Sequence, residues 1–210
     1  MALATAVTVT ACGGQTPDYQ SIWSTTPSTP EPAPSSAAAQ PVPFSQYLEQ
    51  LGVQGEPVPA TGLKDLTVTV PRPRGWSTYT NPNLSPQTEA IAKNNDYPTA
   101  MVLVFRLHGG FDVAEAIRHA TADALLSPGF TKLNESFDDF DGFPSAMIEG
   151  SYNVVDRRLH SYNRIVIPVT PAPAFQRYLV QFTVTSRADQ AVAQSDDIQR
   201  IIDGFSVAVH

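Results

Sequence analysis

The feature that most constrains this chain is a change in composition near residue 44. Residues 13–43 hold seven prolines, many small residues and only two charged residues, Asp18 and Glu31. Such a segment cannot bury enough apolar surface to offset the entropy lost on ordering, and its prolines favour an extended backbone. We therefore expect residues 13–43 to be a disordered tether and residues 44–210 to form one folded domain.

The sole cysteine, Cys12, stands directly before the tether. A lone cysteine has no partner for an internal disulfide or a metal cluster. Val9-Thr10-Ala11 before it and Gly13-Gly14 after it resemble the lipobox of bacterial lipoproteins, whose cysteine receives a diacylglyceryl group. Residues 1–12 are therefore expected to be a lipoprotein signal, although the usual basic residues at its start are missing. The alternative is a tail with an incidental cysteine.

With a lipid on Cys12, the tether would act as a spacer between the membrane and the folded domain. The tether reaches on the order of 90 Å if extended and about 30 Å if coiled, enough to lift a domain away from a membrane. Its Ser/Thr-Pro clusters, such as Thr25-Thr26-Pro27, could carry O-glycans, or the segment could be a bare linker. No run of 18 apolar residues occurs, so we expect no segment to span a membrane.

The charge of the domain argues against one class of partner. All 13 Lys and Arg residues and 18 of the 20 acidic residues lie in residues 44–210, which gives this part a net charge of −5. Nucleic-acid-binding domains usually carry a basic patch or stripe. We therefore expect no nucleic-acid partner, and no docking to anionic lipid by charge alone.

Hydrophobic patterning in the domain predicts both helices and strands. Residues 99–107 (TAMVLVFRL) are apolar on both alternating faces up to Arg106, which is typical of a central strand covered on both sides. The other expected strands are 66–70, 131–139, 144–155, 159–169, 176–186 and a short one after Phe205. Asp141-Gly142 is a hairpin signal between two of them.

Helical periodicity and capping residues predict four helices. They are 46–51 (capped by Ser45), 85–93 (with Pro86 in its first position), 112–126 (opened by Asp112 and Glu115) and 189–203. The inner stripe of the last helix is expected at Ala191, Ser195, Ile198 and Ile202. Strands mostly linked by hairpins, with helices before, between and after them, predict an α+β fold in which helices cover an antiparallel sheet.

A search for catalytic and metal-binding patterns finds none that is specific. The sequence has no G-x-S-x-G, H-E-x-x-H, Walker or C-x-x-C motif. The four histidines are interpreted as surface or loop residues, with His119 on the polar face of its helix. The cluster Asp138-Asp139-Phe140-Asp141-Gly142 is either a calcium loop or a solvated hairpin, and the missing EF-hand spacing favours the hairpin. We expect no metal and no cofactor.

Aromatic residues near the ends of the expected elements are the remaining candidates for a binding site. Most would belong to the core or its rim, but some could line a groove for an apolar ligand. The candidates are Trp76, Tyr79, Phe111, Phe143, Tyr152 and Tyr162, with Phe130 nearby in sequence.

Several short blocks resemble the LpqN/LpqT lipoproteins of mycobacteria, in order and spacing, over most of residues 46–208. They include Pro73-Arg-Gly75-Trp76, Leu107-His-Gly-Gly-Phe111-Asp112, Pro128-Gly-Phe130, Asp141-Gly-Phe-Pro-Ser145 and Tyr178-Leu-Val-Gln181. The resemblance implies a PsbP/Mog1-like α-β-α sandwich, a lipid anchor on the extracytoplasmic side of the cell membrane, and accessory work in building the envelope. It also implies binding of mycolate-type glycolipids and contact with MmpL-type lipid exporters.

Three functional hypotheses remain open at this stage. The first is a lipid-anchored accessory protein that binds or carries envelope lipids, which requires an apolar cavity or groove. The second is a docking module of the envelope without a lipid ligand, which requires an exposed apolar patch. The third is an enzyme, which requires His and acidic side chains converging in a cleft, such as His108 and Asp112 with Ser145. We expect a non-enzymatic protein.

Overall fold

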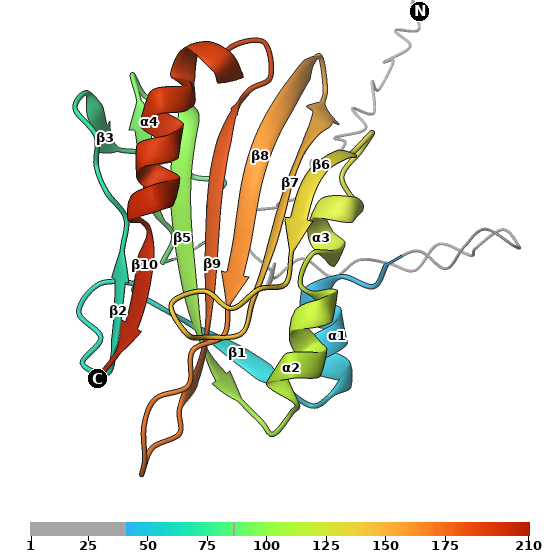
Figure 1. Cartoon of the computed structure of the whole chain (residues 1–210), viewed down its shortest axis with the longest axis vertical. Coiled ribbons are helices and arrows are strands. Elements are labelled where there is room, and N and C mark those ends of the chain that lie inside the picture. The colour runs from blue at the N-terminus through green and yellow to red at the C-terminus, as the bar shows by residue number, and fades with distance from the viewer. Residues whose placement is uncertain (1–40, 86) are drawn as a thin grey trace, which may run out of the picture.

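A computed structural model describes residues 41–85 and 87–210 of the chain (Figure 1). Its centre is an eight-stranded antiparallel sheet with the order β3-β4-β5-β9-β8-β7-β6, in which β1 also pairs with β5. A separate two-stranded ribbon consists of β2 and β10. The strands are β1 (Gln54–Val58), β2 (Leu66–Thr69), β3 (Trp76–Thr78), β4 (Glu89–Lys93), β5 (Asp96–His108), β6 (Thr131–Ser136), β7 (Ser145–Val154), β8 (Arg157–Val166), β9 (Arg177–Arg187) and β10 (Ser206–Val209).

Helices cover both faces of the large sheet. One face carries α4 and the β2–β10 ribbon, and the other carries α1, α2 and η1. This arrangement confirms the expected α+β fold with an antiparallel sheet between helices. The helices are α1 (Phe44–Gln50), α2 (Val113–Ala116), the 3₁₀ turn η1 (Ile117–His119), α3 (Ala122–Leu125) and α4 (Ala191–Gly204).

Strand β5 is the shared wall of two hydrophobic cores. Because successive side chains of a strand point to opposite faces, Val102 and Val104 enter the core under α4, whereas Leu103 and Phe105 enter the core under α1. The first core also contains Ile198 and Ile201 of α4, and the second contains Phe44 and Leu48 of α1. The expectation that this strand is covered on both sides is confirmed.

The C-terminal helix α4 has the expected position in the chain, but the residues that it buries differ from the expected stripe. Ile198 and Ile201 are its buried residues, and Ser195 is exposed, so the expected stripe was wrong at Ser195. The helix starts at Ala191, and its buried spacing continues to Phe205 just beyond its end. The Phe205 ring stacks on Phe182 of β9, with ring centroids 4.1 Å apart and planes 6° apart. This stack fixes α4 and β10 over the sheet.

The expected helix over 112–126 is divided into α2, η1 and α3. Asp112 caps the first segment, because its carboxylate accepts the backbone N–H of Glu115 at 3.1 Å. Thr121, which precedes α3, makes no cap and instead donates its hydroxyl to Glu135 of β6 at 3.0 Å. The buried residues of this region, Ala116, Ile117, Ala120 and Ala124, still follow helical spacing.

The expected helix over 85–93 is wrong. Residues 89–93 (EAIAK) form strand β4, which pairs with β5 so that Ile91 lies opposite Ala100. Ala, Glu and Lys favour helices, but the difference is a few tenths of a kcal/mol per residue and pairing with a buried strand outweighs it. Near the start of the domain, α1 begins at Phe44 with Pro43 in the capping position, so Ser45 is not its cap.

The acidic cluster at 138–142 forms a turn, as the hairpin interpretation predicts. Asp141 and Gly142 have φ values of 53° and 81° between Phe140 and Phe143, which exchange two backbone hydrogen bonds of 2.9 Å. The Asp141 carboxylate accepts the backbone N–H of Val207 at 2.8 Å, which ties the turn to β10. Within the described residues, no group of three His, Cys, Asp or Glu side chains could hold a metal ion.

Candidate ligand-binding pocket

A pocket of about 580 Å³ lies on the α4 side of the sheet, beside β2 and β3 at the left of Figure 1. Its walls are β2, the β3–β4 edge of the large sheet, part of β5 and the loop that joins β3 to β4. Volumes of 300 to 1,000 Å³ are usual for pockets that bind small ligands. The size of this pocket therefore suits a small molecule or one part of a larger lipid.

The floor of the pocket is apolar, and strand register explains its composition. Ile91 of β4 lies opposite Ala100 of β5, so both point to the α4 side of the sheet, as does Val102. Val68 and Val70 face them from the β2 segment. The short side chains of Ala60 and Ala100 leave unfilled space between these walls, where larger residues would close the core.

The rim of the pocket is polar and rich in hydroxyl groups. The Glu89 carboxylate accepts both the backbone N–H and the hydroxyl of Thr61, each at 2.9 Å. Arg72 Nη2 donates to the Thr78 hydroxyl at 3.3 Å and forms none of the ion pairs found among the described residues. Other polar side chains on the rim are Thr69, Thr80, Asn81, Ser85 and Thr88.

The loop between β3 and β4 is held in place by its own hydrogen bonds. Asn81 Nδ2 donates to the Tyr79 hydroxyl at 2.9 Å, and Asn81 Oδ1 accepts the N–H of Asn83 at 2.9 Å. Tyr79 N–H donates to the Ala90 carbonyl at 2.8 Å, so the loop is joined to β4. The pocket wall is therefore held by the fold itself, and it offers an apolar floor, a hydroxyl-rich rim and, in Arg72, a guanidinium group that forms no ion pair with the described residues.

Comparison with known proteins identifies the family. A family model described as "Probable lipoprotein LpqN" matches residues 40–208. The chain belongs to this LpqN-like lipoprotein family. Lipoprotein LpqT of Mycobacterium tuberculosis is 55% identical over 203 residues, which cover 97% of this chain and 89% of LpqT. Membership in a lipoprotein family implies attachment to a membrane of the cell envelope.

Solved structures of low sequence identity support the fold. The crystal structure of LpqN, described as involved in cell envelope biogenesis of Mycobacterium tuberculosis, aligns with a TM-score of 0.66 at 19% identity, covering 78% of this chain and 96% of LpqN. A cyanobacterial PsbP aligns with a TM-score of 0.42 at 13% identity, covering 73% of this chain and 97% of PsbP. The second likeness is too weak to carry an argument.

The proposed anchor of this LpqN-like chain lies outside the described residues. Cys12 and almost all of the 13–43 tether precede residue 41, where the description starts. No helix among the described residues is long and apolar enough to cross a membrane. Lipidation of Cys12 therefore stays a prediction.

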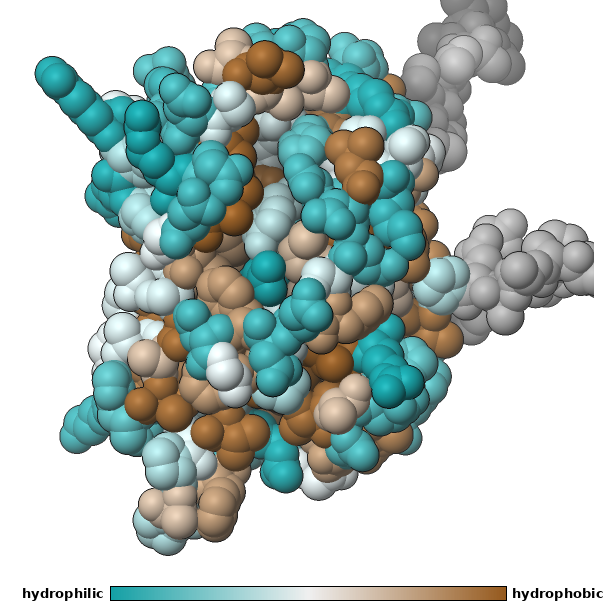
Figure 2. Space-filling model, viewed as in Figure 1, coloured by the Kyte–Doolittle hydropathy of each residue, from teal (hydrophilic) through white to brown (hydrophobic). Residues whose placement is uncertain are grey.

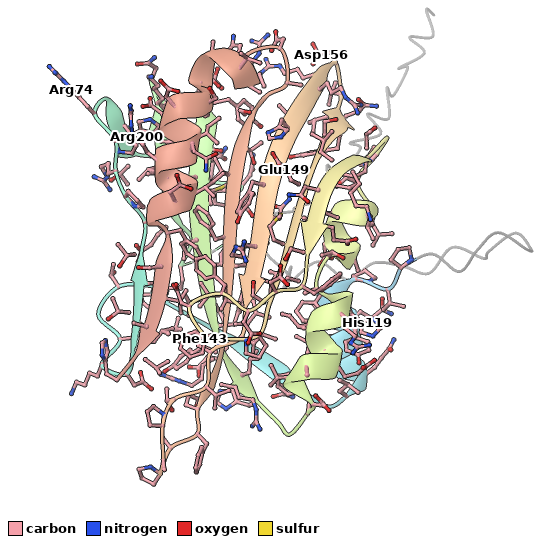
Figure 3. The ribbon with its side chains drawn as sticks, in the orientation of Figure 1. Arg74, His119, Phe143, Glu149, Asp156 and Arg200 are labelled. Carbon is pink, nitrogen blue, oxygen red and sulfur yellow. The ribbon has the colours of Figure 1, made fainter. Side chains whose placement is uncertain are left out.

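The six aromatic candidates of the LpqN-like domain do not meet in one site. Tyr79 lines the pocket. Trp76, Tyr152 and Tyr162 are buried, with exposed fractions of 5%, 8% and 8%. Phe111 packs against the core under α1, and Phe143 packs against the core under α4. Phe143 lies in the loop that crosses the lower front of the sheet (Figure 3).

Two of these aromatic residues have clear structural partners. Trp76 Nε1 donates to Asp197 Oδ2 of α4 at 3.3 Å. The Tyr162 hydroxyl accepts a hydrogen bond from Arg164 Nε at 2.8 Å, and burial raises the pKa of this tyrosine. Sequence reasoning missed most of the pocket because its rim consists of short polar side chains. The alternation in Thr67-Val68-Thr69-Val70 was a usable signal, because it places Val68 and Val70 on one apolar face, which lines the pocket.

The three residues named for an enzyme all have other partners. His108 Nε2 lies 3.1 Å from Glu56 Oε2, Asp112 caps α2, and the Ser145 hydroxyl accepts a hydrogen bond from Arg164 Nη1 at 2.8 Å. His119, expected on the polar face of its helix, keeps its side chain 43% exposed and stacks on Tyr47, with centroids 3.9 Å apart. These contacts are structural, and none brings a nucleophile and a base together.

Proposed function

We propose that the domain is a non-enzymatic binding protein that holds part of an envelope glycolipid in the pocket beside β2 and β3. The observation that carries this proposal is the combination of an apolar floor and a hydroxyl-rich rim in about 580 Å³. An acyl chain would lie against Val68, Ile91 and Val102, and sugar hydroxyls would bond to the threonine and asparagine side chains of the rim. A whole mycolate-type lipid exceeds this volume, so only one end of it would enter.

The setting of this function is the extracytoplasmic side of the membrane. Family membership supports the anchor, and the role of LpqN in cell envelope biogenesis supports a related task for this chain. Contact with an MmpL-type exporter, which would supply or receive the lipid, belongs to the same proposal. No residue of the domain is assigned to that contact.

Native mass spectrometry of the full chain tests the proposal. The Cys12→Ser chain would be exported from a mycolate-making host and purified without detergent. We expect a discrete adduct that organic extraction identifies as an envelope lipid. Val70→Trp fills the pocket and should abolish the adduct, whereas Val192→Trp, at a residue 90% exposed on α4, should keep it.

Two results would contradict the proposal. One is a clean ligand-free mass for the parent chain even after incubation with a trehalose mycolate. The other is an adduct that survives in Val70→Trp, which would place the lipid outside this pocket. A docking role would then be favoured, because edge strand β6 exposes Leu133 at 62% and is followed by Phe137 at 44%.

A further inference from the structure

The loop between β8 and β9 projects from the lower end of the sheet (Figure 1). Residues 165–176 contain no charged residue, and residues 171–175 (PAPAF) are all exposed. Phe175 has an exposed fraction of 60%. In Figure 2 the projecting tip carries no deep teal and is coloured from pale teal to tan. We call residues 170–176 the projecting tip.

The backbone of the projecting tip has few N–H groups left for water. Pro171 and Pro173 have no N–H. Thr170 N–H donates to the Gln176 carbonyl at 2.9 Å, Gln176 N–H donates to the Thr170 hydroxyl at 2.9 Å, and Phe175 N–H donates to the Pro171 carbonyl at 3.3 Å. Three of the five backbone N–H groups in residues 170–176 are thereby paired, which lowers the cost of moving the loop into the polar interface of a bilayer, where water still reaches its carbonyl groups.

The tip also holds its aromatic residue in an unusual conformation. Phe175 has a φ of 43°, in the left-handed region that bulky residues rarely adopt. Strain of this kind persists only where the surroundings enforce it. At the base of the tip, Gln176 Nε2 donates to the Leu107 carbonyl at 3.1 Å, which fastens the loop to the end of β5. The tip thus presents Phe175 on a fixed support.

We propose that the projecting tip inserts into the interfacial layer of the lipid bilayer to which the chain is anchored. A membrane fits better than a protein pocket because the tip is narrow and carries no charge for a partner to pair with. One aromatic residue with its apolar neighbours binds a bilayer weakly. The anchor compensates for this, because a tether keeps the tip at high local concentration near the lipid. The proposal rests on the family's lipid anchor and is independent of the pocket.

The first charged residue after the tip supports this orientation. Arg177 lies with its guanidinium carbon 5.6 Å from the centre of the Phe111 ring, and its Nε is buried without a hydrogen-bond partner among the described residues. A cation beside an apolar insertion suits the phosphate layer of a bilayer. Insertion would direct the opposite end of the sheet away from the membrane, where Figure 3 shows Asp156 in the charged β7–β8 turn.

Site-directed fluorescence on tethered protein tests the proposal. The full chain carrying Cys12→Ser and an N-terminal histidine tag is bound to phosphatidylcholine–phosphatidylglycerol vesicles that contain a nickel-chelating lipid. An environment-sensitive nitrobenzoxadiazole label is placed at Phe175→Cys. The matched control is Val155→Cys, because Val155 is 91% exposed, has a φ of 49° and occupies the β7–β8 turn at the other end of the sheet.

We expect a blue-shifted emission at position 175 with an intensity gain on the order of twofold, and no change at position 155. Equal emission at both positions, or an unchanged emission at 175 on tethered vesicles, would overturn the proposal. A gain at 175 that appears without vesicles as protein concentration rises would also overturn it, because a second copy would then cover the tip. Circular dichroism of both labelled chains verifies that each is folded.

Discussion

Lys93 Nζ on β4 and Asp197 Oδ2 on α4 lie 2.7 Å apart, and the same oxygen accepts Trp76 Nε1 at 3.3 Å. Arg200 Nη1 contacts the other carboxylate oxygen at 3.0 Å. Asp197 therefore joins the C-terminal helix to the β3–β4 edge of the sheet, which is also the edge that carries the pocket. Its side chain is only 15% exposed, so these contacts are partly shielded from solvent.

Asp197→Asn should destabilise the domain by about 1 to 2 kcal/mol at pH 7, because an amide loses the charge-assisted bonds to Lys93 and Arg200. The hydrogen bond from Lys93 is the main factor that lowers the pKa of Asp197. A lowered pKa stabilises the fold above the ordinary aspartate pKa of about 3.9, and this contribution disappears as pH falls through the lowered value.

Urea unfolding at pH 7 and near pH 3 checks this prediction. The gap between parent and Asp197→Asn should narrow at the lower pH. Asp156→Asn is the control. The Asp156 side chain is 83% exposed, and its Oδ1 lies 4.0 Å from Arg157 Nε, so this ion pair is weak and its loss should change the free energy of unfolding by less than about 0.5 kcal/mol. Equal losses for the two variants at pH 7 would show that Asp197 does not join the helix to the sheet.

Asp123 in α3 should have the opposite pH dependence. Burial raises its pKa to about 6, although its carboxylate accepts the backbone N–H of Phe44 at 3.3 Å. The folded state then holds a proton that the unfolded state has lost, so stability falls as pH rises from about 4 to about 6. Asp123→Asn keeps an acceptor for Phe44 and removes the buried charge.

We therefore expect Asp123→Asn to stabilise the domain by about 1 to 3 kcal/mol at pH 7 and to have little effect near pH 4. Urea unfolding at both pH values measures this, with exposed Asp139→Asn as the control, expected to change little at either pH. A destabilisation at pH 7 would mean that the charged form is favoured in the fold and that the Phe44 hydrogen bond outweighs burial.

The fold was largely predictable because its long strands carry their own signals. Residues 99–107 are apolar on both faces, and the strands after residue 130 are apolar runs separated by Asp-Gly, charged or Pro-containing turns, so β5 to β9 could be placed from the sequence. Strands β1, β3 and β4 could not be placed from the sequence. Gly55 and Pro57 interrupt the pattern of β1, which is tolerated because β1 pairs along only one side, with the lower half of β5.

The pocket was less predictable than the fold, because a cavity forms where side chains are too small to fill the space between strands, and the sequence does not show which residues face each other. Ala60 and Ala100 are ordinary small apolar residues in sequence, and only the folded chain, in which Ala100 lies opposite Ile91, brings them together in the floor. Tyr79 was the one candidate found in advance, because aromatic residues stand out. Trp76 stands out equally but fills the core, and sequence alone cannot separate these two outcomes.

Phe205→Ala should cost about 3 to 5 kcal/mol of stability, because it removes a large buried side chain from the centre of the core under α4. Phe205 is 3% exposed and stacks between Phe182 and Phe140, at centroid distances of 4.1 and 5.3 Å. Urea unfolding measures the loss, and Phe137→Ala, at a residue 44% exposed, should cost less than about 1 kcal/mol. Comparable losses in both would exclude Phe205 as the centre of this core.

The last prediction concerns a close approach in β7. A Cβ at Gly150 would meet the Phe130 ring and lie 2.7 Å from the Thr131 carbonyl oxygen, closer than real Cβ atoms come. The Phe130 ring can rotate away, but the Thr131 carbonyl belongs to the paired β6 strand and cannot. Gly150→Ala should therefore cost about 1 to 3 kcal/mol through overpacking.

Gly110→Ala is the matched control, because no atom lies within 4 Å of its Cβ position and its φ is not in the left-handed region. It should be neutral or stabilising by up to about 1 kcal/mol, since alanine restricts the unfolded chain. Urea unfolding of both variants, and of Gly150→Ala combined with Phe130→Ala, separates the causes. If the double variant were as stable as Phe130→Ala alone, the new Cβ would clash with the Phe130 ring and not with the Thr131 carbonyl. The backbone of β6 could then move enough to accept alanine at position 150.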